Sequence, residues 1–110
     1  MFKRILVVEH DVMVRNVLVS IFARENYEVL EAEGGDEALK LLSMFDGTVN
    51  LIITDDRPTS SQLLTYESGI LFFKIDDALR QILEHQTAIS APPIRDLVAE
   101  VERLLRAKTE

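Results

Sequence analysis

The chain has 110 residues, a net charge of −7 and no cysteine. This length suits one domain around one core, and the lack of cysteine excludes disulfide frameworks and thiolate metal sites. The acidic balance argues against nucleic-acid binding, and no apolar run is long enough for a signal peptide or a membrane span. We therefore expect one cytoplasmic domain over residues 1–110, with neither a nucleic-acid nor a membrane partner.

The first part of the chain alternates strand-like and helix-like patterns. The apolar run Lys3–Val8 predicts a strand that is buried on both faces. From Val14 to Phe22, apolar residues recur at helical spacing, which predicts a helix that Asp11 can cap and that ends near Asn26. The alternating segment Tyr27–Glu31 predicts a second strand.

The pattern then repeats. The glycine pair at positions 34 and 35 breaks the chain, and Asp36 can cap a second helix whose buried face carries Ala38, Leu41, Leu42 and Phe45. The fully apolar residues Leu51–Ile53 predict a third strand, which runs into Thr54 and Asp55. Strands that alternate with helices in this way predict a parallel α/β sheet with right-handed crossovers.

The second half of the chain is less regular. The segment Arg57–Gly69 is too short for a loop, a full helix and a second loop, so we expect the third helix to be shortened or missing. We expect a fourth strand at Ile70–Ile75, a helix capped by Asp76, a short fifth strand at Thr87–Ser90 and a final helix at Ile94–Lys108. The predicted fold is therefore a doubly wound, parallel, five-stranded sheet.

Acidic residues follow the first and third predicted strands, at Glu9, Asp11, Asp55 and Asp56. If the strand order is 2-1-3-4-5, as in flavodoxin-like sheets, these strands flank the point where the order reverses, and the acids converge on one crevice. A divalent cation such as Mg²⁺ relieves the repulsion between carboxylates, and an Asp beside it can attack a phosphoryl donor. The alternative is that each acid only caps the helix that follows it.

Three segments together resemble a response-regulator receiver domain of two-component signalling: ILVVEHD, NYEVLEAEGGDEALKLL and LIITDDRP. The resemblance is strong over residues 3–58. It implies that Asp55 is both the phosphoacceptor and one of the Mg²⁺ ligands, and that Glu9 is the first of two further acids that hold the ion. It also implies that an aspartyl phosphate forms in a phosphorelay. The implied partners are a histidine kinase or phosphotransfer protein and a downstream protein target.

The sequence departs from the family pattern at the same pocket, which makes it an atypical member. The second acid of the pair falls on His10, and imidazole suits Zn or Cu better than Mg²⁺, so Asp11 is the candidate substitute ligand. Lys74 stands where the family has Thr or Ser, and it either contacts phosphate or pairs with the acids of a pocket that no longer works. The family's lysine after the fifth strand is missing from Ser90–Pro93.

Two functional hypotheses follow, and neither is an enzyme. Because Met1 lies just before the first strand and Glu110 just after the last helix, the first is a stand-alone receiver phosphorylated on Asp55. The second is a pseudo-receiver that binds proteins without phosphorylation. A fragment of a longer regulator and an Asp-nucleophile phosphatase are the remaining alternatives. If the short middle segment leaves Phe72 and Phe73 uncovered, we also expect a homodimer.

Overall fold

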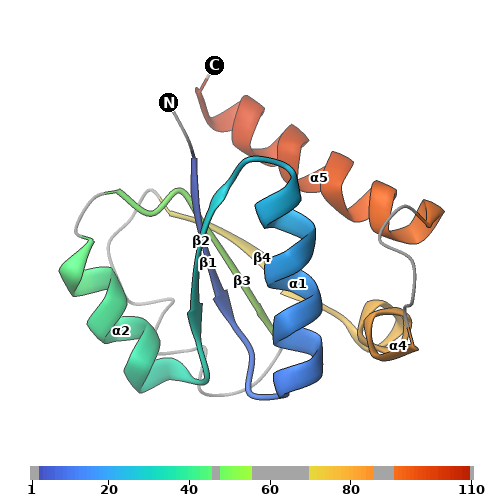
Figure 1. Ribbon diagram of the computed structural model, residues 1–110. Helices are drawn as coiled ribbons and strands as arrows, with labels where there is room; N and C mark the ends of the chain where they lie inside the picture. The colour runs from blue at the N-terminus through green and yellow to red at the C-terminus, as the bar shows by residue number, and fades with distance from the viewer. Residues whose placement is uncertain (1–2, 46–47, 56–69, 86–90, 110) are drawn as a thin grey trace.

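The computed structural model describes residues 3–45, 48–55, 70–85 and 91–109. In these ranges a parallel sheet lies between two layers of helices (Figure 1). The strands are β1 (Arg4–Val8), β2 (Glu28–Ala32), β3 (Leu51–Asp55) and β4 (Leu71–Ile75), and the helices are α1 (Val12–Arg24), α2 (Gly35–Met44), α4 (Asp77–His85) and α5 (Pro92–Thr109).

Each face of the sheet has its own apolar core. Helices α1, α4 and α5 cover one face, where Ile5 and Val7 of β1 are buried, and α2 covers the other, where Leu6 and Val8 are buried. Successive residues of a strand point to opposite faces, so a strand covered on both sides needs apolar residues at every position. This explains why β1 and β3 read as unbroken apolar runs.

The strand order of the described residues is β2-β1-β3-β4, which agrees with the first four positions of the predicted order. The sheet that these residues form has four strands, whereas we predicted five. The predicted fifth strand, Thr87–Ser90, and the shortened third helix within Arg57–Gly69 lie outside the described residues. Both therefore stay predictions.

The aromatic residues Phe72 and Phe73 of β4, whose exposure was the condition for a predicted homodimer, are half-buried. Phe73 packs against the core under α1, α4 and α5, and Phe72 packs against the core under α2. They point to opposite faces because they are neighbours in one strand. The argument for a homodimer built on this pair is therefore weakened, and the homodimer stays a prediction.

The ends of the helices follow from local side chains. Asp76 caps α4 as predicted, because its Oδ1 accepts the N–H of Leu79 at 2.8 Å. Asn26 ends the turn after α1 with a φ of 69°, a left-handed conformation that Asn tolerates better than most residues. The predicted cap at Asp36 is wrong, because α2 already begins at Gly35 and Asp36 lies inside its first turn.

The final helix begins at Pro92, two residues before its predicted start, because proline has no N–H to lose at the first helical positions. Strand β2 begins at Glu28, one residue after its predicted start, and extends one residue past its predicted end to Ala32, which is in register with Val8 of β1.

None of the helices in the described ranges combines the length and the apolar character that a membrane crossing requires.

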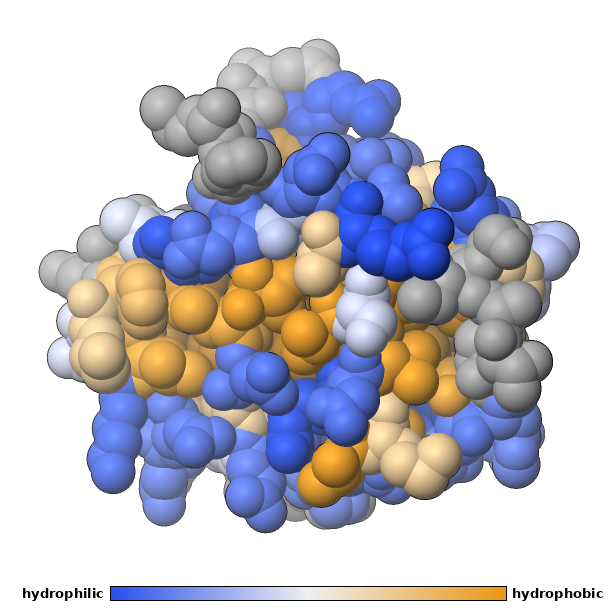
Figure 2. Space-filling model, viewed as in Figure 1, coloured by the Kyte–Doolittle hydropathy of each residue, from blue (hydrophilic) through white to orange (hydrophobic). Residues whose placement is uncertain are grey.

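Strand β2 forms one edge of the sheet and faces the viewer in Figure 1. Figure 2 shows apolar side chains gathered in a band across the middle of this side of the molecule, with hydrophilic residues above and below. The half-buried residues Val29 and Leu30 of β2 contribute to the cores beneath it.

Candidate functional site

The candidate site is the β1–α1 turn, formed by Glu9, His10 and Asp11. Glu9 follows the last residue of β1, and its main-chain N–H donates to the carbonyl of Ala32 at 3.0 Å. This bond holds the turn against the end of β2. The side chain of Glu9 has an exposed fraction of 0%. An acidic side chain is almost never buried to this extent unless a cation compensates its charge.

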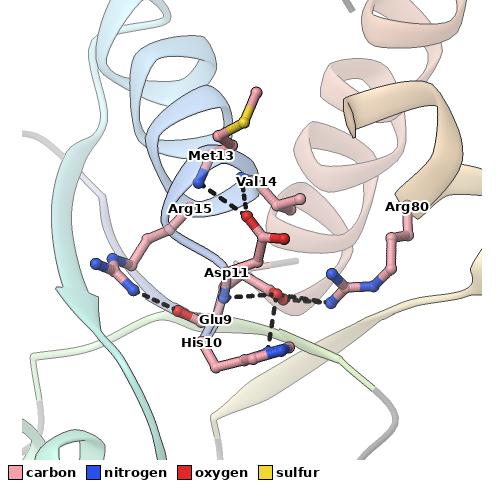
Figure 3. A network of polar contacts seen from close by, with 7 residues as sticks. All are labelled: Glu9, His10, Asp11, Met13, Val14, Arg15 and Arg80. Carbon is pink, nitrogen blue, oxygen red and sulfur yellow. Dashed lines mark hydrogen bonds and ion pairs between the residues drawn. The ribbon is translucent and has the colours of Figure 1, made fainter. Parts of the chain in front are cut away.

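The compensating cation is Arg80, which extends from the first half of α4 (Figure 3). Its Nη2 lies 2.7 Å from Oε1 and 2.6 Å from Oε2 of Glu9. The two residues are 71 positions apart in the sequence. Charge-assisted hydrogen bonds of this length are among the stronger polar contacts in proteins, and burial increases their strength. The pair therefore links the end of β1 to α4.

The rest of the turn contacts the same carboxylate. The main-chain N–H of Asp11 donates to Oε1 of Glu9 at 3.2 Å, and Nδ1 of His10 lies 3.3 Å from the same oxygen. The His10 side chain is 43% exposed, so it lies at the surface of the turn. Arg15 donates to the main-chain carbonyl of Glu9 at 2.7 Å, and its Nε lies 3.4 Å from Glu31. Oε1 of Glu9 thus already meets several positive or donor groups.

Asp11 acts as the N-cap of α1. Its Oδ1 accepts the main-chain N–H groups of Met13 at 2.9 Å and of Val14 at 3.2 Å. A helix begins with N–H groups that have no partner inside the helix, and an Asp at this position satisfies two of them. The side chain therefore points along α1, as Figure 3 shows. This is the structural role that the sequence left open as an alternative for the acids at strand ends.

These three residues do not fit the Mg²⁺ ion that the family resemblance implies. Mg²⁺ requires a near-octahedral set of oxygen ligands. Here the Arg80 guanidinium lies against both oxygens of Glu9, Asp11 uses Oδ1 to cap α1, and His10 offers a nitrogen. Across the described ranges, no three His, Cys, Asp or Glu side chains gather in a way that could hold a metal ion. The predicted metal roles of Glu9, His10, Asp11 and Asp55 stay predictions.

The other predicted site residues lie on the neighbouring strands. Asp55 is the last residue of β3, and its main chain is in register with Ile75 of β4. Thr54, one residue earlier, is in register with Val8 of β1 and with Lys74 of β4. The main chain of Asp55 thus reaches the same sheet edge as the β1–α1 turn. Lys74 is exposed on β4. The phosphoacceptor role of Asp55 and the phosphate contact of Lys74 stay predictions, and Asp56 lies outside the described residues.

Sequence reasoning missed Arg80. The only available signal was its position in the amphipathic helix α4, where it directly follows the apolar residue Leu79. An arginine at such a position is normally read as a solvated residue. Its contact with Glu9 depends on how α4 packs against α1 on this face of the sheet, which no local pattern encodes.

No family model matches the chain. It is 47% identical over 51 residues to the aerobic respiration control protein ArcA of Escherichia coli K12, a match that covers 46% of this chain and 21% of ArcA. It is 29% identical over 91 residues to the two-component response regulator-like protein APRR7 of Arabidopsis thaliana, covering 83% of this chain and 11% of APRR7. The chain therefore matches only a small part of either relative.

Solved structures with the same fold include receiver domains. The receiver domain of the hybrid histidine kinase CckA has a TM-score of 0.65 and 28% identity, and the match covers 93% of this chain and 98% of that one. A LuxR-family DNA-binding response regulator from Silicibacter pomeroyi has a TM-score of 0.70 and 24% identity over 96% of this chain and 92% of its own. The receiver domain of Ssk1 of Saccharomyces cerevisiae was crystallised with the phosphotransfer protein Ypd1. The chain matched in that complex has a TM-score of 0.52 and 17% identity, and the match covers 76% of this chain and 72% of that one. The latter two are similar in fold alone.

Proposed function

Because this chain is a response-regulator receiver domain, we propose that it acts in two-component signalling as a pseudo-receiver, a protein-binding module that does not depend on phosphoryl transfer. One observation carries the proposal. Both acids of the β1–α1 turn contact groups of the chain itself, since Glu9 binds Arg80 and Asp11 caps α1.

The physical argument concerns charge. Phosphoryl transfer to a carboxylate brings a second anionic group beside the first, and catalysis of this step is almost entirely positioning and electrostatic stabilisation. In such sites a metal ion neutralises the developing charge. Here the buried carboxylate that would hold that ion is already neutralised by Arg80, and the next residue is His10 rather than an acid.

The partner follows from the family. The receiver of Ssk1, which shares this fold, was crystallised with a phosphotransfer protein. We propose a histidine kinase or a phosphotransfer protein as the partner that this chain binds, and a further protein as its downstream target. Recognition through surface complementarity needs no phosphoryl group on the receiver, so this partner class is compatible with a pseudo-receiver.

A second candidate function is a receiver phosphorylated on Asp55. The observation that favours it is the register of β3, which brings the main chain of Asp55 to the same sheet edge as Glu9. In this candidate Mg²⁺ would have to compete with Arg80 for Glu9, and Lys74 would contact the phosphoryl oxygens. The identity to ArcA over 51 residues is equally compatible with both candidates.

Intact-mass measurement after incubation with acetyl phosphate separates the two functions. We expect no phosphoryl adduct on the wild type, with or without Mg²⁺, while circular dichroism shows that the protein is folded. A receiver with both acids of the usual pair, treated in parallel, gives the positive control. A Mg²⁺-dependent adduct that disappears in Asp55→Asn would contradict the proposal and establish the second candidate.

A further inference from the structure

The buried carboxylate of Glu9 meets a single nitrogen of Arg80 on both of its oxygens, at 2.7 and 2.6 Å. A cation held between the two oxygens of one carboxylate has the geometry of bidentate metal ligation. Here Nη2 of Arg80 occupies the place between the two oxygens that a metal ion would take. The exposed fractions of the two side chains, 0% for Glu9 and 19% for Arg80, place this contact largely out of water.

We infer that Arg80 is a resident cation that excludes divalent metal ions from the β1–α1 turn, and that its removal converts the turn into a binding site for such ions. The inference deepens the proposed function and rests on it in one respect, namely that the wild-type domain works without a metal. According to this inference, the presence of Arg80 is what prevents the β1–α1 turn from binding a divalent metal ion.

The arginine is held in place by the packing of its own helix. Asp76 caps α4, and its main-chain carbonyl accepts the N–H of Arg80 at 2.9 Å. Leu83, less than one turn further along, is buried in the core that α1, α4 and α5 share. Because Arg80 is covalently tethered and its helix is anchored at two points, it faces Glu9 at a far higher effective concentration than free ions reach in solution.

Without the guanidinium, the turn offers hard ligands and one imidazole. The two oxygens of Glu9 would carry a buried negative charge, and Nδ1 of His10 is 3.3 Å from Oε1 of Glu9. Mn²⁺ accepts both carboxylate oxygen and imidazole nitrogen. It is therefore a better probe of this turn than Mg²⁺, which rarely takes nitrogen ligands.

The test is a Mn²⁺ titration followed by the electron paramagnetic resonance signal of the free ion. We expect Arg80→Gln to bind one Mn²⁺ at least ten times more tightly than the wild type does, and the double variant Glu9→Gln/Arg80→Gln to lose this binding. Arg24→Gln is the matched control, because it removes the same charge from the far end of α1, about 20 Å from Asp11 along a helix that rises about 1.5 Å per residue. We expect Arg24→Gln to behave as the wild type does.

Two results would overturn the inference. One is Mn²⁺ binding by the wild type as tight as that by Arg80→Gln and lost in Glu9→Gln. The other is a folded Arg80→Gln that binds no more tightly than Arg24→Gln. If Arg80→Gln is unfolded alone, millimolar Mn²⁺ is expected to restore its circular dichroism spectrum, and failure to do so also overturns the inference. Phosphoryl labelling of the wild type would refute the proposed function by a separate readout and would leave the Mn²⁺ comparison intact.

Discussion

Replacing Arg80 with methionine is expected to lower the free energy of unfolding by about 3–5 kcal/mol, the range found when one partner of a buried ion pair is removed. The reason is that the carboxylate of Glu9, with an exposed fraction of 0%, keeps its burial and loses its cation. Methionine preserves most of the apolar stem of arginine, so packing changes little. Urea unfolding followed by circular dichroism measures the effect.

The partner substitution gives the internal comparison. Glu9→Gln is expected to cost less than Arg80→Met, because the Arg80 side chain is 19% exposed and can turn its charge toward water. In the double variant Glu9→Gln/Arg80→Met no buried charge remains, so its cost should be smaller than the sum of the two single costs. Arg24→Met, at the exposed end of α1, should change stability by less than about 0.5 kcal/mol. A cost below about 1 kcal/mol for Arg80→Met would show that the pair contributes little.

The second large effect concerns the core under α1. Phe22→Ala is expected to cost about 3–5 kcal/mol, the usual range for a buried aromatic residue that is truncated to alanine. Phe22 has an exposed fraction of 0% and lies in the core shared by α1, α4 and α5. Its ring also meets the ring of Tyr27 edge to face, with the centroids 5.8 Å apart. Burial raises the pKa of Tyr27, with a further contribution from the charges of Glu102 and Glu25.

The same denaturation experiment tests this prediction, with Met13→Ala as the control on the same helix. Met13 is 66% exposed, so its truncation removes little buried surface and should change stability by less than about 0.5 kcal/mol. If Phe22→Ala and Met13→Ala gave equal losses, the assignment of Phe22 to a closely packed core would be wrong.

Much of the fold could be predicted from the sequence because the sheet is covered on both faces. This burial requires unbroken apolar runs such as Leu51–Ile53, while the helices need apolar residues at every third and fourth position. The ends of elements were less predictable. Glu37 rather than Asp36 makes the polar contact at the start of α2, since its Oε1 accepts the N–H of Glu33 at 2.7 Å. Several acids follow one another there, and the sequence does not distinguish them.

The candidate site could be predicted in position but not in its contacts. Glu9 was placed correctly at the end of a buried strand, because parallel strands bring their carboxyl ends to one edge. The partner of its carboxylate comes from α4, 71 residues further along the chain. A lone arginine in an amphipathic helix has no local signature that separates a buried ion pair from a solvated side chain. Tertiary packing alone determines this contact.

Whether the β1–α1 turn binds a metal ion and a phosphoryl group is tested by titrating ¹⁵N-labelled wild type with Mg²⁺ and then with beryllofluoride, a mimic of the phosphoryl group. The binding is followed in ¹H–¹⁵N correlation spectra. We expect the amide signals of Glu9, His10 and Asp11 to shift no more than that of Arg24, because Arg80 already neutralises the turn. Saturable shifts confined to residues 9–11 and to Asp55 would contradict it and would show that the pocket still binds a metal and a phosphoryl group.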